Sequence, residues 1–224
     1  MFKEIELSEQ AEQLGVIIEM LAAIAVTIRE AFVHQQSRSL EDIENQYLDL
    51  NEEIAFDVVM ADDLVIGKSL DDKETIFRYQ KILTHLQMID KSLKLLADAL
   101  RKQMKDRILF SNKEVEQIIM LLERQENILR TLAGIVRNGE GERLDEVSYE
   151  CSELAGSCLK FATSYESCLV EGLCTTESAP ILLMILSRIQ TLVHNEVETV
   201  RLLARWIWDR VADGPLENPA GHPS

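Results

Sequence analysis

Residues that interrupt helices are scarce in this sequence. The 224 residues include four prolines and nine glycines, and two of the prolines fall within the last six residues. Because proline removes a helical hydrogen bond and glycine loses the most backbone freedom, a chain with so few of them can run in long helices. The alternation of period two that marks a half-buried strand is also missing, since valines and isoleucines recur at spacings of three and four. We therefore predict an all-α protein.

Positive charge is in deficit. Lys and Arg total 23 against 39 Asp and Glu, which gives a net charge of −16. A protein that binds nucleic acid needs basic side chains to neutralise the phosphates. This balance argues against nucleic acid as a partner.

Long apolar runs are also absent. The most apolar stretch, Leu14 to Val33, is interrupted by Glu19, Arg29 and Glu30, whereas a membrane-spanning helix needs about 18 or more predominantly apolar residues. The first dozen residues contain four glutamates, where a secretory signal would have a basic start and an apolar run. We expect a protein that does not span a membrane and lies in the cytoplasm.

Recognisable catalytic motifs are missing as well. We find no nucleophile-and-base pair, no phosphate-binding loop, no cofactor motif and no Glu-x-x-His phrase of a di-iron bundle. Gly67-Lys68-Ser69 lacks the preceding glycine and strand of a phosphate loop, which favours a helix end. The four cysteines, Cys151, Cys158, Cys168 and Cys174, fall in or just after one predicted helix without CxxC spacing, which favours reduced, apolar core residues over a zinc site. These absences predict a protein that is not an enzyme.

What the sequence does contain is a duplication. Two stretches of about 105 residues each carry three long amphipathic patterns in the same order, and Lys94-Leu-Leu-Ala97 recurs as Arg201-Leu-Leu-Ala204. Three helices joined by short loops form a bundle. We predict six long helices as two tandem three-helix bundles, over residues 8–110 and 111–212, with a flexible tail at 213–224. The predicted helices cover residues 8–35, 39–67, 71–104, 112–138, 144–172 and 180–211.

Capping residues mark several helix ends. Ser111 is suited to cap the fourth helix, Gly139 to end it, and Pro180 to occupy the first turn of the sixth. Near the end of the sixth helix, Trp206 and Trp208 are two residues apart, which is about 200° of rotation at roughly 3.6 residues per turn. Only one of the two can face the core.

This arrangement resembles the PhoU family of phosphate-signalling proteins, whose members are two tandem three-helix bundles of similar length. The resemblance covers residues 8–212 and rests on the repeat, on the second-helix phrase Leu40-Glu-Asp-Ile-Glu-Asn-Gln-Tyr-Leu-Asp-Leu-Asn-Glu-Glu-Ile54, and on the third-helix endings around Ala97 and Ala204. It implies a non-enzymatic regulator of phosphate uptake or signalling that docks on a membrane phosphate transporter or a sensor kinase. It leaves open whether the protein is a homodimer.

The resemblance also raises metal binding. Family members usually carry a Glu-Arg-x-x-Asp phrase in the third helix of each repeat, which gathers carboxylates for metal ions. The corresponding first-repeat segment here is Leu86-Gln-Met-Ile-Asp90, which keeps one carboxylate, and Glu196 lies in the second-repeat segment. Asp90, Glu126 and Glu196 flank apolar stripes, where a lone carboxylate is costly to bury. They are candidate ligands of a divalent or iron cation, and the alternative is that they reach water at the edge of the core.

The second predicted helix carries the densest negative charge, and its residues Asp49, Glu52 and Glu53 are candidate partner-binding residues. An acidic surface would steer the protein toward a basic partner. Three hypotheses about function follow: a docking regulator, a metal-binding helical protein, or a structural adaptor without a ligand. The acidic surface on the second predicted helix would consist of Asp42, Asp49, Glu52, Glu53, Asp57, Asp62 and Asp63.

Overall fold

The computed structural model of the protein describes residues 2–64, 69–172 and 176–212. Across these ranges the chain is all-α, with long helices, one short 3₁₀ helix and no strand. None of the described helices is both long enough and apolar enough to cross a membrane. The elements are α1 (Phe2–His34), α2 (Ser37–Leu64), α3 (Leu70–Lys105), α4 (Asn112–Asn138), η1 (Gly141–Arg143), α5 (Leu144–Val170) and α6 (Ala179–Ala212).

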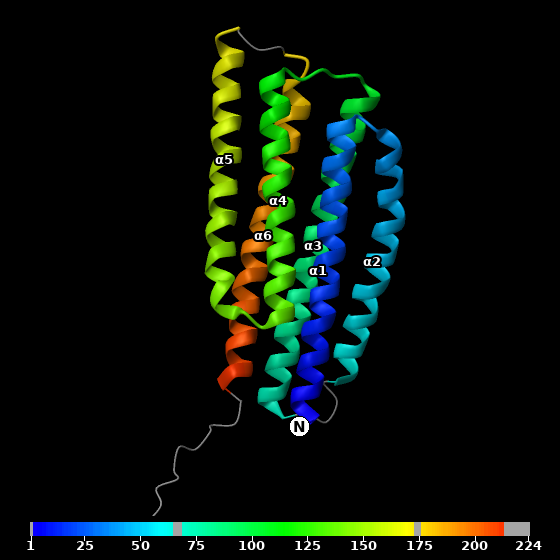
Figure 1. The fold of residues 1–224 in the computed structure, drawn as a ribbon, viewed down its shortest axis with the longest axis vertical. Coiled ribbons are helices and arrows are strands. Elements are labelled where there is room, and N and C mark those ends of the chain that lie inside the picture. The colour runs from blue at the N-terminus through cyan, green and yellow to red at the C-terminus, as the bar shows by residue number, and fades with distance from the viewer. Residues whose placement is uncertain (1, 65–68, 173–175, 213–224) are drawn as a thin grey trace, which may run out of the picture.

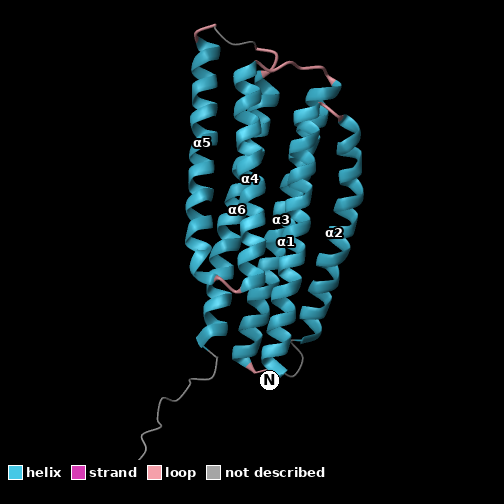
Figure 2. Cartoon of the chain, in the orientation of Figure 1, coloured by secondary structure: helices cyan, strands magenta, loops and turns pink. Residues whose placement is uncertain are grey.

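The six long helices run side by side along one axis (Figure 1), and short described loops connect α1 to α2, α3 to α4 and α4 to η1 (Figure 2). Helices α1, α2 and α3 pack against one another, as do α4, α5 and α6, which gives two three-helix bundles. The bundles meet through two helix pairs, α1 with α4 and α3 with α6, while α2 and α5 lie at opposite edges of the molecule. Each edge helix therefore turns one face toward its own bundle and leaves another face outward.

The helix ends follow local capping chemistry. At the start of α4, Ser111 Oγ accepts a hydrogen bond from the backbone N–H of Glu114, and the Glu114 carboxylate accepts one from the Ser111 backbone. Gly139 ends α4 in the left-handed conformation with φ of 69°, which glycine adopts without a steric penalty. The predicted start of the first helix at residue 8 is wrong, since α1 begins at Phe2 and nothing in the sequence before residue 8 breaks a helix. The predicted stop at Gly67 lies outside the described residues.

A continuous hydrophobic core runs through both bundles, and two aromatic contacts connect elements across it. The rings of Phe32 and Phe110 have centroids 6.3 Å apart, and those of Tyr79 and Trp206 are 6.4 Å apart. Trp206 is completely buried in this core. The Trp208 side chain lies outside the described residues.

The cysteines do not form the uniform set that the sequence predicted. Cys151 and Cys158 are buried free thiols, as expected of small core residues. Cys168, however, is disulfide-bonded, so the expectation that all four are reduced core residues is wrong. Cys168 lies near the end of α5, where it is only partly buried, and Cys174 lies outside the described residues.

Candidate functional site

Asp90 is a buried carboxylate on α3 that meets α2. It is 6% exposed, and its Oδ2 accepts a hydrogen bond from Asn51 Nδ2 at 3.2 Å. Its other oxygen, Oδ1, has no hydrogen-bond partner. Burial raises the pKa of Asp90 to about 6, and the hydrogen bond from Asn51 and the positive charge of Lys94 oppose that rise. Asp90 is thus a carboxyl group that resists ionisation and keeps one unpartnered acceptor.

Glu196 on α6 is completely buried. Gln125 on α4 donates a hydrogen bond from Nε2 to Glu196 Oε1, whereas Glu196 Oε2 and Gln125 Oε1 have no hydrogen-bond partner. Burial raises the pKa of Glu196 to about 8 despite the hydrogen bond from Gln125. Burial, and secondarily the charge of Glu196, also raises the pKa of the Cys151 thiol on α5. At neutral pH both groups are therefore mainly protonated.

Glu126 points toward the other bundle. Its Oε2 accepts a hydrogen bond from Arg29 Nε of α1 at 2.8 Å, and its Oε1 lies 2.9 Å from Arg130 Nη2. The Glu126 side chain is only 9% exposed. The hydrogen bond to Glu126 is the main reason that the pKa of Arg29 is raised. Glu126 therefore acts as one half of an ion pair between the bundles.

The three predicted metal ligands thus occupy separate contacts, Asp90 between α3 and α2, Glu196 between α6 and α4, and Glu126 between α4 and α1. Within the described ranges, no three histidine, cysteine, aspartate or glutamate side chains are placed to hold one metal ion. Hard cations take several oxygen ligands at once. The described residues therefore do not fit a shared metal site.

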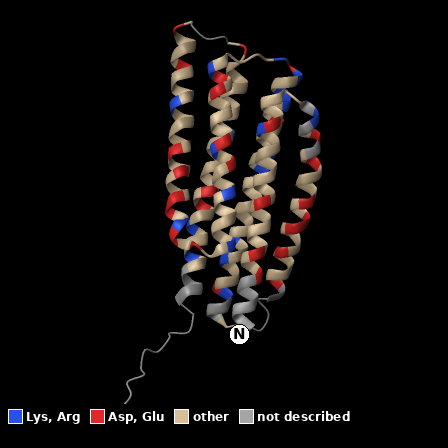
Figure 3. Cartoon of the chain, viewed as in Figure 1, with Lys and Arg blue, Asp and Glu red and all other residues tan. Residues whose placement is uncertain are grey.

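Two of the three predicted partner-binding residues lie on the exposed side of α2, and the third faces α1. Asp49 and Glu52 are exposed, and the half-buried Glu53 accepts a hydrogen bond from Gln13 Nε2 of α1. Acidic residues follow the length of α2 in Figure 3, and Arg38 is its one basic residue. This edge of the molecule is therefore strongly negative, and its part in binding stays a prediction.

Sequence reasoning missed a second feature of α2. Four large apolar side chains on this helix are exposed, namely Leu48 at 63%, Phe56 at 60%, Val59 at 59% and Met60 at 47%. We call these four residues the α2 strip. They lie off the apolar stripe that enters the core, and this departure from the stripe is the signal that could have found them. Clustered exposed apolar residues often mark an interaction surface.

A pocket of about 370 Å³ adjoins the α2 strip where α1, α2 and α3 meet. Asp57 on its wall is 5% exposed, and Oδ2 accepts a hydrogen bond from the Tyr79 hydroxyl at 3.0 Å. Burial raises the pKa of Asp57 to about 6, against the effect of that hydrogen bond. The prediction that Asp57 belongs to the exposed acidic surface is wrong, because its side chain is turned toward α3. We call this the α1–α2 pocket, and its lining residues are Glu9, Gln10, Gln13, Phe56, Asp57, Met60, Ala61 and Tyr79.

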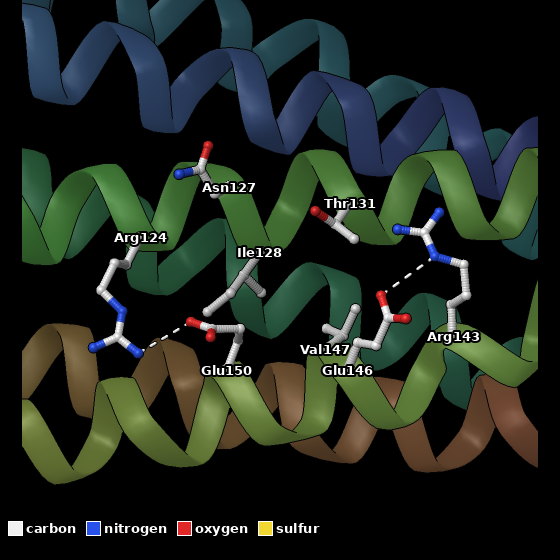
Figure 4. A pocket seen from close by; sticks show the side chains of 8 residues that line it. All are labelled: Arg124, Asn127, Ile128, Thr131, Arg143, Glu146, Val147 and Glu150. Atoms are coloured by element: carbon white, nitrogen blue, oxygen red, sulfur yellow. Dashed lines mark hydrogen bonds and ion pairs between the residues drawn. The ribbon is translucent and has the colours of Figure 1, made fainter.

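A second pocket, of about 310 Å³, lies between α4 and α5 and is shown in Figure 4. Arg124 on α4 reaches Glu150 on α5, with Nη2 and Oε2 3.0 Å apart. Arg143 at the end of η1 reaches Glu146, with Nε and Oε2 3.3 Å apart. Each guanidinium group is therefore matched by a carboxylate, and the pocket has no excess charge with which to select an ion.

The chain has an all-α, PhoU-like fold built from two three-helix bundles. A solved structure with this fold is the phosphate transport system regulatory protein PhoU from Streptococcus pneumoniae, which is similar to this chain with a TM-score of 0.78. The alignment covers 96% of this chain and 99% of that chain at 12% sequence identity. No protein-family model matches the sequence, and no curated protein matches it either.

Proposed function

We propose that this chain is a regulator of phosphate uptake or signalling that acts by docking on a membrane phosphate transporter or a sensor kinase. The observation that carries the proposal is the extent of the structural likeness, which spans nearly the full length of both this chain and a phosphate transport regulator. A fold by itself specifies function weakly. The proposal therefore also draws on the docking features of α2.

The acidic edge supports a basic docking partner. Asp49 and Glu52 are exposed on a helix that has one base, Arg38, and the whole chain carries a net charge of −16. Complementary charge accelerates encounter, and salt screens this attraction at separations beyond a Debye length of about 8 Å at physiological ionic strength. Docking is therefore expected to weaken as salt rises.

Two experiments test the proposal. The first deletes the gene and measures phosphate uptake in phosphate-replete medium, where loss of a regulator should change the uptake rate. The second restores the gene with Asp49→Lys, Glu52→Lys and Glu53→Gln, the last of which keeps a hydrogen-bonding group opposite Gln13. We expect this triple variant to lose about tenfold or more of its affinity for the transporter or kinase, because charge complementarity becomes repulsion.

The matched control makes nearly the same charge change on the other edge helix. Glu153→Lys and Glu166→Lys alter two exposed carboxylates of α5 and should leave docking on α2 intact. Unchanged uptake after gene deletion would overturn the regulatory function. Equal losses in the α2 and α5 variants would instead show that net charge, and not the acidic edge of α2, governs binding.

Metal binding and a purely structural adaptor role stay as the alternative predictions. Asp90 and Glu196 each keep a buried oxygen without a hydrogen-bond partner, and that is the one feature favouring a cation at either place. Elemental analysis of protein purified without chelator, compared with Asp90→Asn and Glu196→Gln, checks the prediction for both carboxylates. If a stoichiometric metal persists in both variants, neither Asp90 nor Glu196 is one of its ligands.

A further inference from the structure

The outer face of α2 combines apolar and acidic side chains in one narrow region. Because successive helical residues are rotated by about 100°, Leu48, Glu52, Phe56, Val59 and Met60 fall within an arc of about 120°. The four apolar members are each at least 47% exposed, and Glu52 lies among them. Helix α2 packs against α1 and α3, and this arc lies on the side of α2 opposite the buried residues Leu50, Ile54 and Ala61. A helix face with this composition has the properties of a binding surface for another amphipathic helix.

The α1–α2 pocket extends this surface at one side. Phe56 and Met60 belong to both, since they are exposed members of the α2 strip and also line the pocket. The polar groups of the pocket are mainly acceptors: it contains the carboxylates of Glu9 and Asp57, and the side-chain oxygen of Gln10 has no hydrogen-bond partner. No lysine or arginine is among its described lining residues. Such a lining suits a side chain that brings positive charge and several N–H donors on an apolar stem, which describes lysine and arginine.

The charges on this face decide among possible occupants. A second copy of the chain, docked through the same face, would place Asp49 and Glu52 of one protomer near the same carboxylates of the other, and like charges repel. Anionic lipid and nucleic acid are disfavoured for the same reason. A basic helix has complementary charge for the carboxylates and apolar residues for the α2 strip.

We propose that the α2 strip and the α1–α2 pocket together receive a basic amphipathic helix of a partner protein, whose apolar face packs on Phe56 and Val59 and whose lysine or arginine enters the pocket between Glu9 and Asp57. The proposal rests on the docking function proposed above and specifies the chemistry of the partner. Phe56 is the central anchor. It is an exposed aromatic residue, and it belongs to both the α2 strip and the lining of the α1–α2 pocket. Buried aromatic anchors carry much of the energy of many interfaces.

The test uses a designed probe and the full-length protein. The probe is a fluorescein-labelled synthetic helix of about five turns with leucine on one face and lysine on its flanks, and fluorescence anisotropy measures its binding. Two control probes keep the composition but scramble the order, or replace lysine with glutamate. The wild-type protein should bind the ordered basic probe and neither control.

Variants then locate the binding surface. Phe56→Ala with Met60→Ala should weaken binding of the ordered basic probe about tenfold or more, and Glu9→Gln, at an exposed position, should weaken it several-fold. Leu159→Ala is the matched control, because Leu159 is 61% exposed on the opposite edge helix α5. Circular dichroism checks that each variant is folded. Equal affinity of the Phe56/Met60 variant and the wild type, or equal binding of ordered and scrambled probes, would overturn the proposal.

Two further readouts separate this inference from the proposed function. If sedimentation shows a wild-type dimer that the Phe56/Met60 variant converts to a monomer, the occupant is a second copy and the inference is wrong. If the variant restores normal phosphate uptake to the deletion strain, the inference is wrong while the regulatory function stands. If gene deletion leaves uptake unchanged, the regulatory function fails, and the probe measurements still decide what binds α2.

Discussion

Glu196 shows how one residue can set a pH dependence. It is completely buried, and burial raises its pKa to about 8 from an ordinary value of 4.5. Between these two values the folded protein binds the proton that the unfolded chain releases, so the free energy of unfolding falls as pH rises through this range. Asp57 and Asp90, whose pKa values are raised to about 6, act in the same direction over a lower range. Above pH of about 6.5, Glu196 is the main carboxyl group of the three that still titrates.

We predict that Glu196→Gln removes most of the decrease in the free energy of unfolding that occurs above a pH of about 6.5. One pKa unit corresponds to about 1.4 kcal/mol, so the wild type should lose on the order of 2 kcal/mol between pH 6.5 and 8.5 through this group, and the variant should not. Urea denaturation at the two pH values measures the difference. Glu166→Gln, at an exposed position on α5, should keep the wild-type dependence. A Glu196→Gln variant with the wild-type pH dependence would contradict the assignment.

Helix α4 provides a prediction at the scale of an element, because two of its glycines have opposite roles. Gly139 ends the helix with φ of 69°, where a side chain is strained, whereas Gly134 lies inside the helix with open space where a Cβ would be. We predict that Gly139→Ala lowers the free energy of unfolding by about 1 kcal/mol. The same substitution at Gly134 should raise it by about 0.5–1 kcal/mol, because alanine favours the helix interior.

Thermal and urea denaturation of the two alanine variants provide the check, and each serves as the control for the other. Opposite signs would establish that α4 ends where the sequence placed its glycine cap. Stabilisation by both substitutions would mean that Gly139 is not held in the left-handed conformation in solution.

In helix α2 the spacing of apolar residues indicates which face is buried, but it does not indicate which residues of other helices that face will contact. Ile43, Tyr47, Leu50 and Ile54 recur at spacings of three and four along α2, and all four residues are buried. The pattern says which residues share a face, since side chains three and four apart are neighbours. It does not say that Asp57 would find Tyr79 on α3, because that contact depends on how two helices pack. The exposed side of α2 follows from its place at the edge of the molecule.

At the scale of the whole molecule, the contact between the bundles contains both apolar packing and charge. Arg29 of α1 pairs with Glu126 of α4, and Arg137 of α4 pairs with Glu19 of α1. Gly15 makes room for Arg137, since a Cβ there would lie 2.5 Å from Arg137 Cγ. These pairs join residues from the two halves of the chain.

We predict that Arg29→Met lowers the free energy of unfolding by about 1–3 kcal/mol, because methionine keeps an apolar stem but leaves the buried Glu126 carboxylate without its closest partner. Adding Glu126→Gln should recover part of the loss by removing that charge. Lys102→Met is the control: its pair with Asp106 is exposed, and such pairs contribute about 0–1 kcal/mol. Urea denaturation measures all four proteins. A loss in Arg29→Met no larger than in Lys102→Met would show that the pair does not stabilise the contact between the bundles.

The sequence by itself determined the helical class, the PhoU-like resemblance and several helix ends. Helix periodicity and capping are local, since they depend on residues about three or four positions apart. Ser111 could therefore be predicted to cap α4 from its neighbours alone, and the structure confirms it. The two-residue spacing of Trp206 and Trp208 likewise predicted that both side chains cannot face the core together.

Only the tertiary structure decided the environment of each carboxylate and the character of each outer face. Glu126 meets Arg29, which is 97 residues away in the chain, and Glu196 meets Gln125, which is 71 residues away. The sequence singled out Asp90, Glu126 and Glu196 together because all three flank apolar stripes, but helix packing turned them toward three different neighbours. Burial, hydrogen bonding and charge pairing arise from such distant contacts, so the pKa values of buried carboxylates and the α2 strip became visible only after the helices were assembled.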